Sequence, residues 1–189
     1  MRLFFITSNI HKFLEIKEIF SSEKMDLKLT MTNLRKIEIQ DEDLVKIVKF
    51  ATEHLLSNGY DNFFIEDSGL FIRALNNFPG PFSSYVYKTI GNSGILRLMQ
   101  DIDDRSAYFK SVIALCYNGK IKMFEGIVNG TISREIKGNK GFGFDPIFIP
   151  RGYSKTFGEM ERFEKNKISH RAKAAREMIK YLKQLLSST

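Results

Sequence analysis

The sequence predicts an α/β fold with a mixed central sheet. Short apolar runs, typical of buried strands, alternate along the chain with segments whose apolar residues recur at helical spacing. Asn118-Gly119 lies between two strand-like runs in the middle of the chain, and this pair predicts a hairpin and therefore an antiparallel part of the sheet. No repeat or linker divides the 189 residues, so a single domain over residues 1–189 is expected.

The first part of the chain is expected to alternate strands and helices. Ser8 and Asn9 can cap a helix, and Asn58-Gly59 can end one. The expected elements are, in chain order, a strand at 3–7, a helix at 13–20, a strand at 27–31, a loop at 33–43 and a helix at 44–56.

The rest of the chain is expected to contain more strands and a long terminal helix. Ser68-Gly69 is interpreted as a turn that ends one strand and joins it to a short partner. The expected elements are strands at 63–65 and 70–72, a loop at 76–84, a helix near 95–99, strands at 106–116, 121–128, 130–136 and 146–149, and a helix at 167–186.

Composition narrows the class of protein. The net charge of +7 favours an anionic partner, and nucleic acid, a membrane surface and a phosphorylated small molecule all fit that sign. Cys116 is the one cysteine, so no intrachain disulfide is expected and a place in a core strand is favoured. The apolar run at 3–6 is too short for a signal peptide or a membrane span, so we expect a cytoplasmic protein with no membrane partner.

Two adjacent carboxylates follow the apolar run Phe63-Phe64-Ile65. A strand driven into the core by these side chains carries Glu66 and Asp67 to the rim of the fold, where they can hold a hard divalent cation such as Mg²⁺. The alternative is a strand that ends in an ordinary polar turn.

A candidate phosphate site follows the first strand, in the segment Thr7-Ser8-Asn9-Ile10-His11-Lys12. A strand that turns directly into a helix presents backbone N–H groups and the positive end of the helix dipole. Thr7 and Asn9 add short polar side chains, and Lys12 adds a point charge. The alternative is a capped helix with a solvated lysine.

Two further segments are candidates for binding the rest of a ligand. The segment from Gly138 to Pro146 combines glycines with Phe142 and Phe144, whose rings could stack on a base, although it could instead be a tight turn with two core aromatics. Ser169 is a candidate N-cap, and the cations of His170 and Arg171 behind it would oppose the helix dipole, which favours an anion or polar ligand over a solvated basic face.

Taken together, these segments resemble the inosine triphosphate pyrophosphatase family, also called the Ham1-like or RdgB-like house-cleaning nucleotidases. Six motifs in family order carry the resemblance. They are Thr7-x-Asn9-x-x-Lys12, Glu38-x-Gln40, Glu66-Asp67-Ser68-Gly69-Leu70, Pro79-Gly80-Pro81-Phe82-Ser83, Gly141-Phe142-Gly143-Phe144-Asp145-Pro146 and Ser169-His170-Arg171.

The resemblance implies a hydrolase that cuts a nucleoside triphosphate between the α- and β-phosphates and releases pyrophosphate. The implied substrates are ITP, dITP and XTP. The implied fold is a long curved mixed sheet flanked by helices in two lobes with an active-site cleft, and the implied cofactor is Mg²⁺, with Mn²⁺ as an alternative. A homodimer without a stable nucleic-acid partner is also implied.

The resemblance assigns a role to each matching residue. Asp67 would orient or deprotonate the attacking water, and Phe144 would stack on the purine. The implied metal ligands are Glu38, Glu66 and Asp67. The other implied substrate contacts, including a base-pocket position at Glu15, are Thr7, Ser8, Asn9, Lys12, Ser68, Phe142, Asp145, Lys165, Ser169, His170 and Arg171.

Base selectivity has a physical basis. Hypoxanthine and xanthine carry an acceptor oxygen at C6 where adenine carries a donor amino group. Adenine would leave donors such as His170 and Arg171 unpaired, and each buried unpaired donor costs about 1–3 kcal/mol.

The chain departs from the family pattern at three places. Ser8 stands where many relatives have glycine, and Phe144 replaces a tryptophan or tyrosine. The lysine that relatives bring from the helix after Gln40 has only Lys46 and Lys49 as weak candidates.

Two other functions remain as alternatives. A Maf-type nucleotide pyrophosphatase would prefer pyrimidine or modified nucleotides, and the Gly-Phe-Gly-Phe-Asp and Ser-His-Arg segments argue against it. A basic, non-catalytic nucleic-acid-binding protein would fit the charge but leaves Glu66 and Asp67 unexplained.

Overall fold

A computed structural model describes residues 2–25 and 27–187 and divides them into two compact units. Unit 1 comprises residues up to 67, 111–126 and those from 171 onward, and unit 2 comprises 68–110 and 127–170. The chain forms an open mixed sheet of seven strands in the order β2-β1-β3-β5-β6-β7, with β4 paired to β3, and this confirms the predicted α/β class. None of the helices among the described residues is long and apolar enough to cross a membrane.

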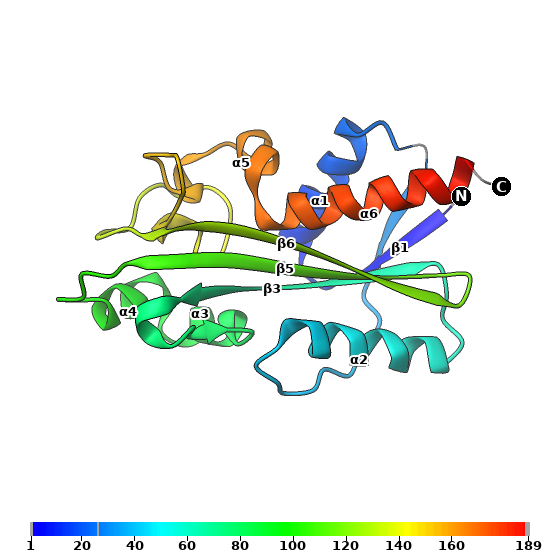
Figure 1. The fold of residues 1–189 in the computed structure, drawn as a ribbon, viewed down its shortest axis with the longest axis horizontal. Coiled ribbons are helices and arrows are strands. Elements are labelled where there is room, and N and C mark those ends of the chain that lie inside the picture. Colours follow the sequence, from blue (N-terminus) through cyan, green and yellow to red (C-terminus); the bar gives the residue numbers. More distant parts are fainter. Residues whose placement is uncertain (1, 26, 188–189) are drawn as a thin grey trace. The chain divides into compact units, whose positions relative to one another are not determined.

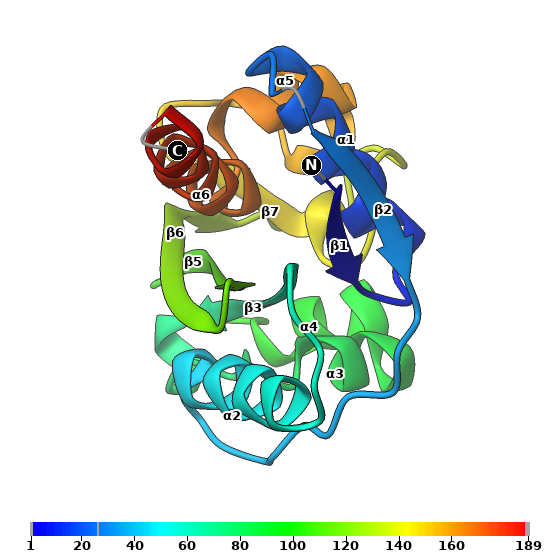
Figure 2. The same ribbon diagram turned by 90° about the vertical axis from the view of Figure 1, so that its right-hand side faces the viewer.

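Unit 1 begins with a β–α–β arrangement. Strands β1 (Arg2–Ile6) and β2 (Lys28–Thr32) are parallel, and Figure 2 shows them side by side. Helix α1 (Ile10–Ser22) connects them, as expected for parallel neighbours that need a crossover. Helix α2 (Leu44–Ser57) follows the 33–43 loop, and Asn58 is its C-cap, in agreement with the predicted end of the helix at Asn58-Gly59.

The core of unit 1 is built on aromatic rings and a small-residue helix face. The rings of Phe5 and Phe64 stack at 4.5 Å, and Phe20 of α1 stacks on Phe64 at 6.3 Å. Helix α6 (His170–Ser187) contributes three fully buried alanines and Met178 to the same cluster. Small side chains let the helix approach closely, and each large apolar side chain buried here contributes about 1.5–3 kcal/mol.

Unit 2 is built from short helices and strands around a core of its own. Val86 of α3, Ile95 of α4 and Met99, the residue that caps the end of α4, pack into a cluster that also contains Phe148 and Phe157. Its elements are β4 (Pro79–Gly80), α3 (Ser83–Thr89), α4 (Gly91–Leu98), β7 (Phe148–Pro150) and α5 (Arg162–Ile168), with short 3₁₀ turns at Arg73–Leu75, Asp145–Ile147 and Phe157–Glu159.

Three long strands contribute residues to both units: β3 (Phe63–Ile72), β5 (Ser106–Tyr117) and β6 (Lys120–Ile132). Strands β5 and β6 form the predicted hairpin, visible in Figure 1 as two neighbouring strands joined at one end. Asn118 and Gly119 both take positive φ there, 50° and 69°, which matches the twist of a two-residue hairpin turn.

The predicted turn at Ser68-Gly69 is wrong, because β3 runs without interruption from Phe63 to Ile72. Gly69 serves another purpose: a Cβ at this position would lie 2.2 Å from the carbonyl oxygen of Gly80 on the paired strand β4. The glycine therefore permits close strand pairing and does not mark a turn. As a consequence, Glu66 and Asp67 lie inside a strand and not at its end.

Two smaller predictions also need correction. The separate strand expected at 130–136 does not form, since β6 continues to Ile132. The single terminal helix is divided: α5 ends at Ile168, Ser169 has extended backbone (φ −65°, ψ 156°), and α6 begins at His170. A residue with extended backbone interrupts the helix although the apolar spacing continues past it.

Candidate active site

The turn between β1 and α1 is organised by two side chains. The Asn9 side-chain oxygen accepts hydrogen bonds from the backbone N–H groups of His11 (2.9 Å) and Lys12 (3.2 Å), and Thr7 Oγ1 accepts one from Asn9 N–H (3.1 Å). The backbone N–H groups expected to face a phosphate thus have internal acceptors. Because only oxygens accept in these bonds, the Thr7 hydroxyl hydrogen and the Asn9 amide hydrogens are not used by them and can be donated to a phosphate.

Lys12 joins this turn to the two carboxylates of β3. Its ammonium nitrogen lies 3.0 Å from Glu66 Oε2 and 3.3 Å from Asp67 Oδ1. The Glu66 side chain is fully buried, whereas that of Asp67 is 25% exposed. The three residues singled out from distant parts of the sequence are therefore brought together.

Arg171 extends the same network on its other side. Its Nε lies 3.2 Å from Glu66 Oε1, and its Nη1 donates to Glu15 Oε2. Both Arg171 and Glu15 are at most 3% exposed. The order of contacts is Glu15–Arg171–Glu66–Lys12–Asp67, a continuous alternation of negative and positive charge within unit 1.

The network keeps its members charged despite burial. Burial alone would raise the pKa of Glu66, but the charges of Arg171 and Lys12 outweigh it and hold the pKa well below its ordinary value. Burial would likewise lower the pKa of Lys12, and the carboxylates of Glu66 and Asp67 reverse that effect and raise it. Glu66 is therefore a carboxylate, and Lys12 an ammonium, at neutral pH.

The donor chemistry here suits a divalent metal. Glu66 Oε2 and Asp67 Oδ1 converge on one cation, the Lys12 ammonium, so two carboxylate oxygens face a common position. Mg²⁺ is bound in this way, by one or two carboxylates together with substrate phosphates. Glu38, the third predicted ligand, lies exposed in the 33–43 segment and pairs with Lys36. Among residues 2–25 and 27–187, no three His, Cys, Asp or Glu side chains form one metal-binding group.

Sequence reasoning missed one member of this network, Ser111. Its hydroxyl donates a hydrogen bond to Glu66 Oε1 at 2.6 Å, and the residue is 0% exposed. Ser111 lies on β5, 45 positions from Glu66, in a strand whose next five residues are all buried and apolar. The only signal in the sequence is a serine hydroxyl directly before an apolar run, and this signal is too weak to assign a role to Ser111.

Unit 2 buries an ion pair of its own. Lys165 Nζ of α5 lies 2.6 Å from Asp145 Oδ2, and both side chains are 3% exposed. The same carboxylate oxygen accepts the backbone N–H of Phe142 at 2.8 Å. The glycine-rich segment and the Lys165 region, both predicted to bind a ligand, are thus joined in one cluster.

Aromatic rings surround this ion pair. The ammonium of Lys165 lies 4.9 Å from the ring centroid of Phe142 and 5.5 Å from that of Phe157. Phe144 is only 3% exposed and meets Tyr87 edge to face at 5.5 Å, so it is a core residue of unit 2. Phe142, which is partly exposed, is therefore the more accessible of the two rings predicted to stack on a base.

The Ser-His-Arg motif is divided between the two units. His170 belongs to unit 2, where its ring stacks on Phe109 at 4.6 Å and is 2% exposed, whereas Arg171 belongs to unit 1. Ser169 is fully buried at the break between α5 and α6. Ser8 is exposed and Ser68 partly exposed, and their predicted substrate contacts stay predictions.

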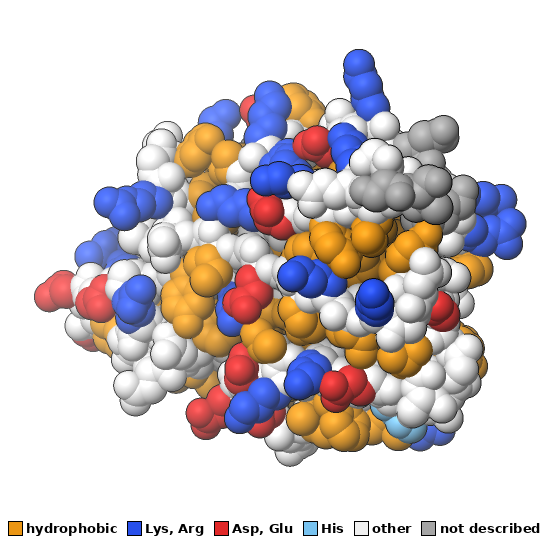
Figure 3. All heavy atoms as spheres, turned by 45° about the vertical axis from the view of Figure 1, so that its right-hand side comes forward, with side chains coloured by type: hydrophobic (Ala, Val, Ile, Leu, Met, Phe, Trp, Pro, Cys, Tyr) orange, Lys and Arg blue, Asp and Glu red, His pale blue; other side chains and the backbone are white. Residues whose placement is uncertain are grey.

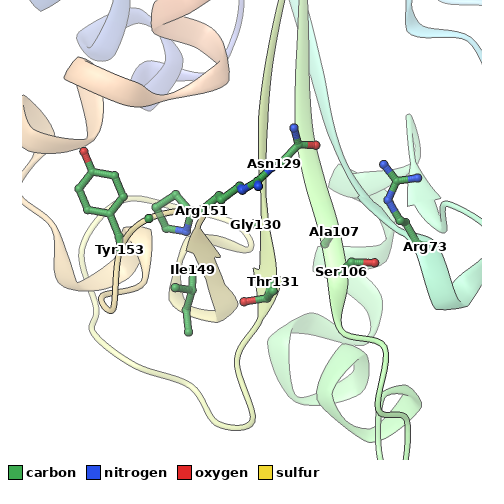
Figure 4. A pocket seen from close by; sticks show the side chains of 11 residues that line it. Arg73, Ser106, Ala107, Asn129, Gly130, Thr131, Ile149, Arg151 and Tyr153 are labelled. Atoms are coloured by element: carbon green, nitrogen blue, oxygen red, sulfur yellow. The ribbon is translucent and has the colours of Figure 1, made fainter.

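Unit 2 also carries a surface groove of about 560 Å³ that sequence reasoning did not anticipate. Strands β5, β6 and β7 form its floor, and Figure 4 shows Arg73 on one side of β5 and β6 and Tyr153 on the other. Gly130 lies in the floor, and no larger residue fits there, because a Cβ would come within 2.2 Å of the Ile149 carbonyl oxygen. None of the predicted ligand-binding residues lines this groove.

Basic side chains are mixed with other kinds of side chain on the face shown in Figure 3. Lys and Arg side chains are interspersed there with Asp and Glu and with apolar side chains. A track of nucleic-acid backbone calls for clustered cations. This face therefore gives no support to the nucleic-acid-binding alternative.

The fold and the site together define a class of protein: an α/β protein that gathers carboxylates, a lysine and an arginine where a metal and a polyphosphate can be held. Comparison with known proteins identifies the family to which the chain belongs. The chain belongs to the Ham1 family, whose sequence model matches residues 3–181.

Relatives of known name agree with this family. The chain is 47% identical to the dITP/XTP pyrophosphatase of Hyperthermus butylicus over 94% of this chain and 93% of the relative. It is 48% identical to the dITP/XTP pyrophosphatase of Korarchaeum cryptofilum over 95% of each chain. The structure of the Staphylococcus aureus Ham1 protein matches with a TM-score of 0.83 at 26% identity, covering 97% of this chain and 99% of that one.

Proposed function

We propose that this protein is a metal-dependent nucleoside triphosphate diphosphohydrolase that converts deaminated purine nucleotides, ITP, dITP and XTP, to the monophosphate and pyrophosphate. The observation that carries the proposal is the Lys12–Glu66–Asp67 cluster of unit 1, in a chain nearly half identical to dITP/XTP pyrophosphatases. A buried carboxylate held ionised beside an ammonium suits an anhydride hydrolase. It has no evident purpose in a protein that merely binds an anion.

In the proposed reaction, a water oxygen forms a bond to the α-phosphorus and the bond from that phosphorus to the bridging oxygen breaks. Asp67 orients the water and accepts its proton, since it is the more exposed of the two carboxylates. The displaced bridging oxygen leaves with pyrophosphate. Lys12, with the hydrogens of Thr7 and Asn9, donates to the phosphate oxygens on which negative charge accumulates.

Glu66 and Asp67 would hold the metal, with Glu38 as the third predicted ligand. A bound Mg²⁺, or Mn²⁺ in its place, supplies positive charge to the triphosphate. Glu66 contributes a permanent negative charge, because Arg171 and Lys12 keep its pKa low. Arg171 stays protonated for the same reason: burial would lower its pKa, but Glu66 and Glu15 raise it.

The purine would be recognised by the cluster around Lys165 and Asp145 in unit 2. Lys165 can offer a donor hydrogen to an acceptor oxygen at C6, and the Phe142 ring provides a face for stacking. Adenine would present its own amino donor to the Lys165 ammonium. The adenine amino group would find a donor where hypoxanthine and xanthine find one for their oxygen, and a buried amino group without an acceptor accounts for rejection by about 1–3 kcal/mol.

A homodimer in the cytoplasm, where the nucleotide pool is, belongs to the same proposal. Helix α3 supports the dimer because Tyr85 is 70% exposed and Phe82, the N-cap residue three positions before it, is 42% exposed. Exposed aromatic side chains that cluster on one element are typical of interfaces. Light scattering after size exclusion tests the dimer, and a mass near 22 kDa would count against it.

The proposed activity is tested by measuring pyrophosphate release from ITP, dITP and XTP beside ATP, GTP and CTP, with Mg²⁺ and then with EDTA. We expect metal-dependent release that favours the deaminated purines. A preference for CTP would indicate a Maf-type enzyme, and no release from any of the triphosphates would refute the proposal.

A further inference from the structure

The two oxygens of the Glu66 carboxylate have different kinds of partner. Oε1 accepts the hydroxyl of Ser111 at 2.6 Å and lies 3.2 Å from Arg171 Nε. Oε2 lies 3.0 Å from Lys12 Nζ, whose other carboxylate partner is Asp67 at 3.3 Å. One oxygen therefore contacts the interior of unit 1, and the other contacts the cation shared with Asp67.

This division matters because a glutamate side chain does not orient its own carboxylate. The last torsion of glutamate has a broad, roughly twofold preference, so neighbouring donors must fix the plane of the two oxygens. Arg171 contacts Oε1 with its Nε at 3.2 Å, while its Nη1 pairs with Glu15. A short bond from a second donor at a different position removes the remaining freedom.

Ser111 has the properties required of that second donor. It lies on β5 and is 0% exposed, so strand pairing and packing hold its Cα in place. Its hydroxyl is neutral, so it can bind Oε1 without adding a charge that would compete with a cation.

We propose that Ser111 is a positioning residue that fixes the Glu66 carboxylate through Oε1 and so directs Oε2 toward the cation position shared with Asp67. The inference rests on the proposed metal-dependent function and deepens it. Partners that hydrogen-bond a ligating carboxylate set its orientation, and their removal typically weakens metal binding or activity by about 10–100-fold. Ser111 therefore acts on the metal and the turnover without touching the substrate.

The chain offers a matched control in Thr52. This residue is also 0% exposed and in unit 1, and its hydroxyl donates at 2.7 Å to the Val48 carbonyl oxygen within α2. Thr52→Val removes a buried hydroxyl whose hydrogen bond is of similar length but is donated to the Val48 carbonyl oxygen and not to Glu66. Any loss common to Ser111→Ala and Thr52→Val is a stability effect.

The experiment measures Mn²⁺ binding by electron paramagnetic resonance in the wild type, Ser111→Ala, Ser111→Cys and Thr52→Val, without turnover. We expect a dissociation constant about tenfold or more weaker in Ser111→Ala. Ser111→Cys, which keeps a weak donor, should recover part of the loss, and Thr52→Val should match the wild type. Ser111→Ala should also lower kcat for ITP about tenfold at saturating metal and leave KM within about twofold.

Two outcomes overturn the inference, and they are distinguishable from failure of the proposed function. Unchanged Mn²⁺ binding and kcat in a folded Ser111→Ala variant, beside an active wild type, would refute the positioning role alone. Equal losses in Ser111→Ala and Thr52→Val would show that the hydroxyls act only through stability. A wild type without metal-dependent turnover would refute the proposed function, whatever the variants do.

Discussion

In unit 1, five charged side chains contact one another in a continuous series that runs from Glu15 to Asp67. In unit 2, a buried ion pair joins only two charged side chains, Lys165 and Asp145, among aromatic rings. The first arrangement is redundant, since Arg171 and Lys12 each lie between two carboxylates. The second relies on one close pair. Redundant charge suits the fixed electrostatics of phosphate chemistry, and a cation beside aromatic rings suits the recognition of a planar, polar base.

The largest effect is expected when the chemistry of unit 1 is removed. Asp67→Asn keeps the size of the side chain and loses the proton acceptor, so turnover of every nucleotide should fall by about 10²–10⁴-fold. Pyrophosphate release measures this, with thermal unfolding to confirm the fold. Asp103→Asn, at an exposed position of unit 2, is the control. Near-normal turnover in Asp67→Asn would remove Asp67 from the mechanism.

The difference in redundancy predicts a difference in stability between two similar substitutions of a buried acid by its amide. Asp145→Asn removes the carboxylate that Lys165 contacts at 2.6 Å, and breaking such a buried pair costs about 3–5 kcal/mol. Glu15→Gln leaves Arg171 with Glu66 and should cost only about 1–3 kcal/mol. Urea unfolding compares the two, and equal losses would contradict the contrast between the units.

A smaller effect is expected on metal binding when Lys12 is changed. Its ammonium contacts the same two oxygens that would ligate a metal, and a metal at about 2.1 Å from them could not share that position with it. Lys12→Met should therefore bind Mn²⁺ more tightly without nucleotide, by about tenfold, because a unit charge at ~4 Å contributes roughly 1–4 kcal/mol. Calorimetry measures the affinity. Weaker binding would show that Lys12 supports the metal and does not compete with it.

The smallest effect concerns Cys116, the only cysteine of the chain and a reporter of unit 1. Burial, with the nearby Asp61 carboxylate, raises the pKa of its thiol to about 12. The folded thiol should resist alkylation at pH 8–9 and react only when unit 1 opens. Because the unfolded thiol ionises near pH 8.5, its contribution to stability is present below that pH and is lost as pH rises toward 12. Rapid alkylation of the native protein would contradict this.

Much of the fold could be predicted because local signals agree with it. Asn9 caps α1, and Asn118-Gly119 forms the hairpin, since both depend on short-range backbone chemistry. The turn predicted at Ser68-Gly69 was wrong because, in the sequence alone, a glycine that permits close strand pairing cannot be told from one that permits a turn. The distinction depends on Gly80, eleven positions away.

The residues of the candidate site also differ in whether the sequence could predict them. Its charged motifs could be predicted, and the structure brings Lys12, Glu66 and Asp67 together as the motifs required. Ser111 could not be found, because its role depends on one long-range contact and on no local pattern. The role of each predicted site residue, including Glu38 as a metal ligand and Phe144 as a stacking ring, stays a prediction.

The most direct test of this division of roles is the ratio of kcat/KM for ITP to that for ATP, measured in Lys12→Met and Lys165→Met beside the wild type. Lys12→Met should lower both values and leave the ratio within about threefold, because the triphosphate is common to both substrates. Lys165→Met should lower the ratio by about tenfold or more, mainly through ITP, because the base contact is lost. A ratio that survives Lys165→Met, or one that collapses in Lys12→Met, would contradict the assignment of phosphate chemistry to unit 1 and base selection to unit 2.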